Sequence, residues 1–122
     1  MTEPPNGSPF AHLDLDRALD YVGDPAAIAS VLVIFLEMME RTMPKVTLAL
    51  GQLDMSATGK HLHSLKGSIP MFCSAPLCEH LARVELLCKT SAAEVVVQAC
   101  EALLPELECL QGELKHYLAT PR

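Results

Sequence analysis

The stretch "IASVLVIFLEMMERTMPKVTLALGQL" (residues 28–53) decides the fold of this chain. Its apolar residues recur at intervals of three and four positions, which places them on one side of a long helix with charged residues between them. Asp24 and Pro25 come just before it, and a capping aspartate followed by proline is a typical helix start. Pro44 lies inside the stretch and predicts a kink or a break there. The stripe consists of Ile28, Val31, Leu32, Phe35, Met39, Met43, Val46, Leu50 and Leu53.

A second apolar stripe follows after Asp54, which can cap the new helix. Its spacing alternates regularly between three and four residues, which is typical of one seam facing a partner helix. A shorter helix is expected over residues 14–21, ahead of the long one, and Gly23 closes it. The second stripe consists of Met55, Thr58, Leu62, Leu65, Ile69 and Phe72.

Two more helices complete the predicted fold. One starts after a turn at residues 74–76, and the other opens on the capping box "SAAE" (91–94) and ends before Thr120. The pattern predicts an all-α protein: an up-down antiparallel four-helix bundle with an additional short N-terminal helix. Prolines and glycine in residues 1–10 predict a disordered leader, which leaves residues 11–119 as the domain.

Composition narrows the possible partners and the location. The 122 residues include 15 acidic and 9 basic side chains, a formal net charge of −6, which argues against nucleic acid or an anionic membrane surface as the main partner. The five cysteines are an odd number without CxxC spacing, so they are interpreted as buried free thiols in a reducing compartment. No signal peptide or membrane-spanning run is evident, and we expect a cytoplasmic protein.

The stretch "HLHSLKGS" (residues 61–68) carries the candidate chemistry. On the second stripe's helix, His63 points away from the seam, Gly67 lies one turn further on the same exposed face, and Lys66 flanks both, whereas His61 lies nearer the core. Two histidines two residues apart diverge on a helix, so no metal site is predicted. An exposed mid-helix glycine costs about 1 kcal/mol, which suggests that another protein approaches His63 closely. A neutral imidazole is a nitrogen nucleophile, and Lys66 can offset the charge of an incoming phosphoryl group.

These residues resemble the phosphoacceptor signature of histidine-containing phosphotransfer (HPt) domains, the four-helix-bundle intermediates of multistep phosphorelays. The family pattern His-x-Leu-Lys-Gly-Ser/Ala is met by "HSLKGS" (63–68), and the flanking stretches "VGDPAAIASVLVIFLEMM" (22–39) and "LCEHLARVE" (77–85) resemble the neighbouring helices of the family. The chain departs from the family pattern at Pro70, which should kink the acceptor helix, and at Cys73, where a small residue is common.

The resemblance implies that His63 reversibly accepts a phosphoryl group from a receiver-domain aspartate and passes it to another receiver. Lys66 would stabilise charge, and Gly67 would give the receiver clearance. Expected partners are response-regulator receiver domains and a hybrid sensor kinase, with the protein itself a monomer. It would need no cofactor of its own, since Mg²⁺ is expected on the receiver. Partner contacts are expected at Lys60, Ser64, Ser68 and Pro70.

The sequence leaves two other functions open. A helical adaptor or regulator could bind a receiver or kinase without taking phosphate. A dimerising kinase-type bundle would require an ATP-binding domain, and these 122 residues contain neither a P-loop nor a glycine-rich nucleotide loop. The chain is therefore expected to be a phosphocarrier rather than a kinase.

Overall fold

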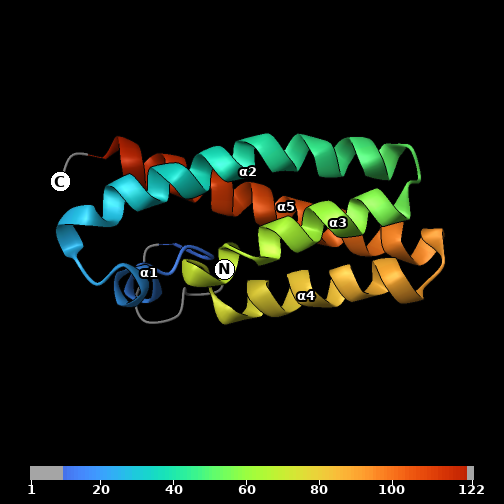
Figure 1. Cartoon of the computed structure of the whole chain (residues 1–122), viewed down its shortest axis with the longest axis horizontal. Helices are drawn as coiled ribbons and strands as arrows, with labels where there is room; N and C mark the ends of the chain where they lie inside the picture. The colour runs from blue at the N-terminus through green and yellow to red at the C-terminus, as the bar shows by residue number, and fades with distance from the viewer. Residues whose placement is uncertain (1–9, 121–122) are drawn as a thin grey trace.

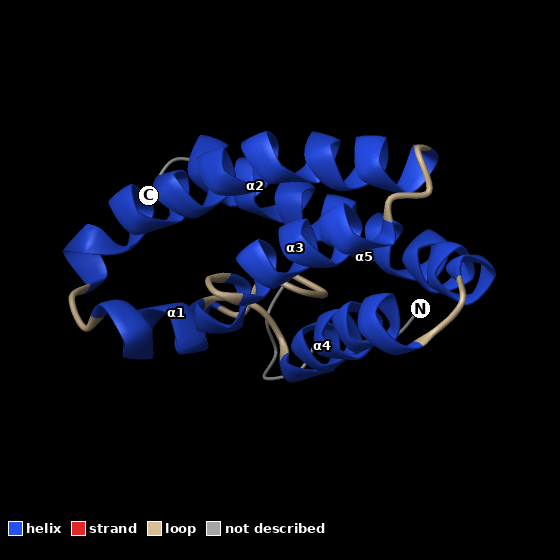
Figure 2. Cartoon of the chain, turned by 45° about the vertical axis from the view of Figure 1, so that its right-hand side comes forward, coloured by secondary structure: helices blue, strands red, loops and turns tan. Residues whose placement is uncertain are grey.

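The computed structural model describes residues 10–120. Four long helices pack antiparallel, each against two neighbours in the order α2, α3, α4 and α5, and a short helix lies across one end (Figure 1). The predicted all-helical bundle with an extra N-terminal helix is confirmed, and Figure 2 shows helices joined by loops throughout. The predicted leader lies outside the described residues except for Phe10. The helices are α1 (Leu15–Val22), α2 (Ile28–Gly51), α3 (Met55–Lys66), α4 (Ala75–Thr90) and α5 (Ala93–Ala119), with 3₁₀ turns η2 (Pro25–Ala27) and η3 (Ile69–Met71).

The core is built from the apolar stripes of the four long helices. Phe35 of α2 stacks on Phe72 with ring centroids 4.3 Å apart, which joins the long helix to the segment after α3. Every position of the seam predicted from Met55 to Phe72 is buried or half-buried, Thr58 included. Thr58 tolerates burial because its hydroxyl donates to the Asp54 carbonyl at 2.8 Å.

Helix α2 passes through Pro44 without a break, so of the two alternatives predicted there, a kink or a break, the break does not occur. It ends at Gly51, and Leu53 is not part of the buried stripe: it lies in the turn to α3 with φ 55° and is 62% exposed. The Leu53 and Asp54 amides donate to the carbonyls of Leu50 and Ala49, which closes the helix end with Leu53 in the left-handed conformation. A side chain at such a position is strained by about 1–2 kcal/mol.

Helix α3 ends earlier than its apolar seam. The helix stops at Lys66, and Ile69 and Phe72 reach the core from the 3₁₀ turn η3 and its end. Pro70 explains the stop, because it has no N–H to donate to the Lys66 carbonyl and restricts the residue before it. The predicted mid-helix position of Gly67 is therefore wrong: Gly67 is the C-cap of α3, with an ordinary φ of −67°.

The two predicted aspartate caps are confirmed: Asp24 and Asp54 each accept a backbone N–H in the first turn that follows them. Asp14 caps α1 in the same way. The capping box "SAAE" (91–94) does not form. Ser91 has an extended backbone, and its N–H donates to the Leu87 carbonyl, which ends α4. Helix α5 begins after Ala92 and has no side-chain cap.

Between residues 10 and 120, no single helix is long and apolar enough to cross a membrane. Helix α1 and the segment Pro25–Gly51 pass that test only as a pair, which is bent by 110° at its break.

Candidate functional site

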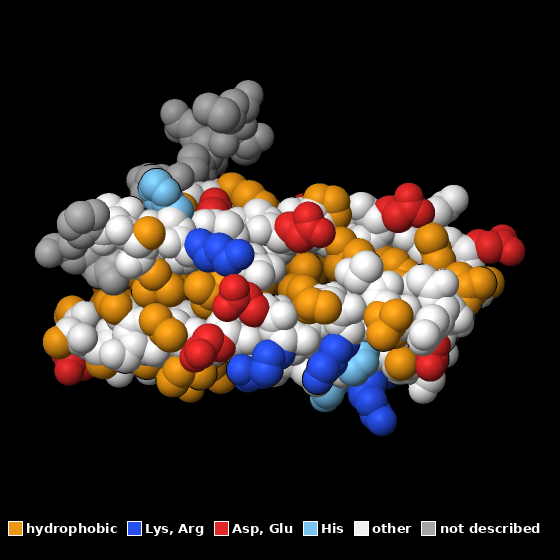
Figure 3. Space-filling view, turned by 90° about the horizontal axis from the view of Figure 1, so that it is seen from above, with side chains coloured by type: hydrophobic (Ala, Val, Ile, Leu, Met, Phe, Trp, Pro, Cys, Tyr) orange, Lys and Arg blue, Asp and Glu red, His pale blue; other side chains and the backbone are white. Residues whose placement is uncertain are grey.

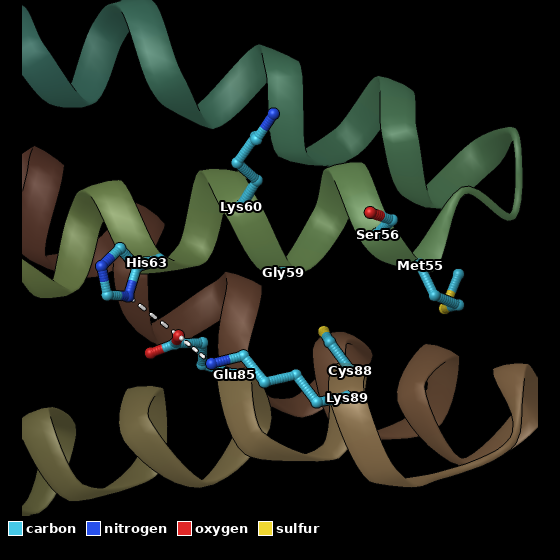
Figure 4. A pocket seen from close by; sticks show the side chains of 8 residues that line it. All are labelled: Met55, Ser56, Gly59, Lys60, His63, Glu85, Cys88 and Lys89. Atoms are coloured by element: carbon cyan, nitrogen blue, oxygen red, sulfur yellow. Dashed lines mark hydrogen bonds and ion pairs between the residues drawn. The ribbon is translucent and has the colours of Figure 1, made fainter.

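His63 meets a carboxylate that comes from the neighbouring helix. Its side chain is 72% exposed, yet its Nδ1 lies 2.9 Å from Oε2 of Glu85, a residue of α4 whose side chain is only 3% exposed. Lys89, one turn further along α4, places its Nζ 3.3 Å from the same Oε2. Lys66 of α3 places its Nζ 3.2 Å from Oε1. One buried carboxylate thus anchors an exposed imidazole and two partly exposed ammonium groups (Figure 4, which draws His63, Glu85 and Lys89).

Burial and the three basic neighbours act on the pKa of Glu85 in opposite directions. Burial raises it, while the contacts with His63, Lys66 and Lys89 lower it and prevail, so the pKa lies below the ordinary glutamate value. The group is therefore a carboxylate at neutral pH. Its Oε1 accepts no hydrogen bond of good geometry from the described residues, so the Lys66 contact is an ion pair.

The ionised Glu85 determines which ring nitrogen of His63 is free. A carboxylate only accepts hydrogen bonds, so Nδ1 must carry the proton. In the neutral ring the lone pair then belongs to Nε2, on the far side of the ring from Glu85. The arrangement presents one defined nitrogen to a reaction partner and holds the ring in one orientation.

The close approach of α3 and α4 depends on Gly59. A Cβ built on this buried glycine would lie 3.0 Å from Cβ of Cys88 on α4, closer than side chains normally pack. A groove of about 580 Å³ runs between the two helices here and includes His63 (Figure 4). Its lining residues are Met55, Ser56, Gly59, Lys60, His63, Glu85, Cys88 and Lys89.

The other predicted site residues are spread around the end of α3. Gly67 is exposed, and a Cβ there would meet only the α3 backbone at ordinary distances, 3.4 Å from the Ser64 carbonyl. Lys60 lines the groove, but its side chain points away from Glu85 (Figure 4). Ser64 bonds back to the Lys60 carbonyl at 3.3 Å. Ser68 is half-buried, and the half-buried Pro70 accepts a bond from Arg17 through its carbonyl at 3.4 Å, which ties it to α1.

The sequence reasoning missed Glu85, although a signal was present. Glu85 follows Leu77 and Leu81 at helical spacing and lies beside Val84, so an acidic residue occupies the buried side of α4. A charged residue in such a position is rare unless it is paired. Gly59 gave a similar signal, since it lies next to the seam residue Thr58.

Charge on the surface is uneven despite the acidic composition. On the face in Figure 3, most of the Lys, Arg and His side chains gather along one edge, whereas Asp and Glu side chains are spread over the whole face. Within residues 10–120, no three His, Cys, Asp or Glu side chains are grouped so that they could hold a metal ion. The chemical groups of the site are thus the imidazole of His63 as a nucleophile and the ammonium groups of Lys66 and Lys89 as nearby positive charge.

Comparison with known proteins identifies a family. No curated protein and no solved structure matches the chain. The model of one family, described as Hpt domain, matches residues 30–119. That match includes nearly all of α2 and the whole of α3, α4 and α5, and with them His63 and Glu85. The chain belongs to the Hpt domain family, the histidine phosphotransfer domains of phosphorelays.

Proposed function

We propose that His63 accepts a phosphoryl group on Nε2 from the aspartate of a receiver domain and passes it to the aspartate of another receiver. The observation that supports this most is the pairing of an exposed imidazole with a buried carboxylate 2.9 Å from its Nδ1. Such a pair fixes the tautomer and points the free nitrogen outward. It has the same effect as the carboxylate that orients a catalytic histidine in hydrolases.

In the forward step, Nε2 attacks the phosphorus of the aspartyl phosphate. An N–P bond forms while the bond from phosphorus to the aspartate oxygen breaks, and the carboxylate leaves with the electron pair. Because Nδ1 keeps its proton, the ring becomes positively charged. Glu85 stabilises that charge directly. In the second transfer a new aspartate attacks the same phosphorus, and Nε2 leaves as the neutral imidazole.

Lys66 supplies positive charge where the phosphoryl group arrives. His63 lies in the last turn of α3, where the negative end of the helix dipole disfavours an anion. A phosphoryl group on nitrogen adds up to about two negative charges. Lys66 is in the same turn, and its Nζ is already held near the site by Glu85. It can turn toward the phosphoryl oxygens without leaving the cluster.

The receiver is proposed to dock over the end of α3 and the groove beside it. Gly67 offers no side chain there, and Lys60, Ser64 and Ser68 are proposed to contact the receiver. The Mg²⁺ that phosphoryl transfer needs is proposed to come with the receiver. The upstream donor would then be the receiver of a hybrid sensor kinase, and the protein would act as a monomeric phosphocarrier.

The first test is phosphorylation by a receiver domain charged with acetyl phosphate in the presence of Mg²⁺. Wild type should take up an acid-labile label, and His63→Gln should take up none. His61→Gln is the matched control, because His61 lies two residues away on the same helix and is half-buried. It should be labelled like the wild type. ¹⁵N NMR of the labelled protein should show phosphate on Nε2.

The same experiment separates the phosphocarrier from an adaptor that binds a receiver without taking phosphate. An adaptor predicts a complex with the receiver that survives His63→Ala and no phosphohistidine from any donor. Equal labelling of wild type and His63→Gln, or an acid-stable label on Ser64 or Ser68, would contradict the assignment.

A further inference from the structure

Two cysteines face each other at the start of α4, away from the His63 cluster. Cys73 is fully buried in the segment before α4, and Cys78 is half-buried at the end of the first turn of that helix. Their Sγ atoms are 2.9 Å apart. A disulfide requires about 2.05 Å, so the two sulfurs need to approach by less than about 1 Å.

The surrounding backbone holds the pair in place. Cys73 forms an isolated bridge with Leu13, and the amide of Ser74 donates to the His12 carbonyl at 2.7 Å. The Cys78 amide donates to the Ser74 carbonyl at 3.1 Å, as the first turn of α4 forms. Both sulfurs are therefore on firmly bonded segments, and a bond between them needs no rearrangement of the bundle.

The two thiols differ in reactivity. The hydrogen bond from Cys73, together with the nearby Arg17 guanidinium, lowers the pKa of Cys78 to about 7 against the opposing effect of burial. The same hydrogen bond and burial raise the pKa of Cys73. Cys78 thus carries the thiolate and is the more accessible of the two, while Cys73 stays a protonated thiol beside it.

We propose that Cys73 and Cys78 form a reversible disulfide when the protein meets a peroxide. The Cys78 thiolate attacks one peroxide oxygen, the O–O bond breaks, and sulfenic acid forms with release of hydroxide. The Cys73 sulfur then attacks the Cys78 sulfur, an S–S bond forms, and the sulfenic oxygen leaves as water with the Cys73 proton. In sum, two thiols lose two electrons and two protons to one peroxide, which yields two waters. A dithiol restores the pair by exchange.

The disulfide would close the chain from residue 73 to residue 78 around the first residues of α4. Glu85 and Lys89 lie in later turns of the same helix, so the His63 cluster keeps its contacts. The oxidised protein should therefore still take phosphate on His63. It should also unfold at a higher temperature than the reduced protein, because the link restricts the unfolded chain.

The test is mass spectrometry of the full chain treated with hydrogen peroxide and then trypsin. The tryptic peptide 67–83 contains Cys73 and Cys78 and no other cysteine. After peroxide it should be about 2 Da lighter and resist alkylation, and dithiothreitol should reverse both changes. Cys109→Ser, which removes an exposed cysteine, is the matched control and should behave like the wild type.

Two variants keep the test decisive. Cys78→Ser should leave Cys73 reduced and open to alkylation in denaturant. Cys73→Ala should let Cys78 proceed beyond sulfenic acid, because no second thiol is in reach. Sulfinic acid on Cys78 of the wild type with Cys73 still alkylatable would overturn the proposal. So would a link found only between two copies of the chain.

Discussion

The bundle contains two histidine–glutamate pairs with opposite burial. In the pair on α3 and α4, the carboxylate of Glu85 is 3% exposed and the imidazole of His63 is 72% exposed. In the pair on α4 and α5, the imidazole of His80 is 18% exposed and the carboxylate of Glu106 is 39% exposed. Both join neighbouring helices through Nδ1 of the histidine.

The difference in burial indicates that one pair serves a reaction and the other serves helix packing. A buried carboxylate cannot move to solvent, so it holds the exposed ring of His63 in one orientation and leaves Nε2 open to a partner. In the other pair the imidazole of His80 is the more buried group, and the carboxylate of Glu106 is exposed to water. His80 is thus placed to fasten α4 to α5, whereas His63 is placed to react.

The largest effect is expected from removing the buried carboxylate. Glu85→Ala should slow phosphorylation of His63 by about 10- to 100-fold, since it loses both the orientation and the charge that stabilises the ring. Glu85→Gln keeps an oxygen acceptor without the charge and should lose less. The measurement is the initial rate of phosphoryl transfer from a charged receiver domain.

Glu106→Ala is the matched control for that experiment. It removes the carboxylate of the other pair and should leave the transfer rate within about two-fold of wild type. Circular dichroism would show that both variants are folded. If phosphoryl transfer to His63 is equally fast in Glu85→Ala and Glu106→Ala, the buried carboxylate has no special role in the reaction.

The next effect concerns the glycine that brings α3 close to α4. In Gly59→Ala the new Cβ would lie 3.0 Å from Cys88, which should lower the free energy of unfolding by about 1–3 kcal/mol. It should also slow the transfer, because Glu85 moves away from His63 when the helices separate. Urea unfolding checks the first expectation.

Gly112 provides the comparison for Gly59. It lies exposed on α5, and nothing comes within 4 Å of a Cβ placed there. Gly112→Ala should raise the free energy of unfolding by about 0.5–1 kcal/mol through helix propensity alone. If Gly59→Ala is stabilising to the same degree, the contact with Cys88 does not limit the approach of the helices.

The parts of this site that were predictable follow from helical periodicity within one segment. The seam through Leu62 and Leu65 shows which side of the helix is buried, and His63 must then face outward. Asp24 and Asp54 were recognisable as caps, because a cap depends only on the next three residues. These features are local, and the structure confirms them.

Contacts between two helices could not be predicted from the periodicity of one segment. The contact from Glu85 to His63 spans 22 residues and depends on how α4 is rotated against α3. The end of α3 illustrates a local competition: the apolar spacing continues to Phe72, but the missing N–H of Pro70 ends the helix at Lys66. Ser91 failed as a cap because its backbone closes α4 instead.

A smaller effect is expected at Lys66. An ion pair at a partly exposed site contributes roughly 0.2–1 kcal/mol, so Lys66→Ala should slow phosphorylation of His63 by up to about five-fold. Lys115→Ala is the control, since Lys115 of α5 makes a long ion pair with Glu40, 3.9 Å away. It should leave the rate unchanged. A loss of rate in both variants would mean that net charge, rather than a local contact, matters.

The smallest effect is the acid dependence of stability that Glu85 brings. Its pKa is lower in the folded protein than the ordinary glutamate value of about 4.3, so its contribution is fully present above that value. The contribution disappears as pH falls through the folded-state pKa, where the buried carboxylate takes a proton and releases its three basic partners. Wild type should therefore lose its advantage over Glu85→Gln as urea unfolding is repeated from pH 6 down to about pH 3. Lys89→Ala sharpens the test: one cation fewer raises the folded-state pKa toward the ordinary value, so the decline should still begin near about pH 4.3 but be smaller and end at a higher pH than in wild type. A constant difference between wild type and Glu85→Gln over the whole range would show that the buried carboxylate is not stabilised by its cations, and the contrast with the exposed Glu106 would then rest on geometry alone.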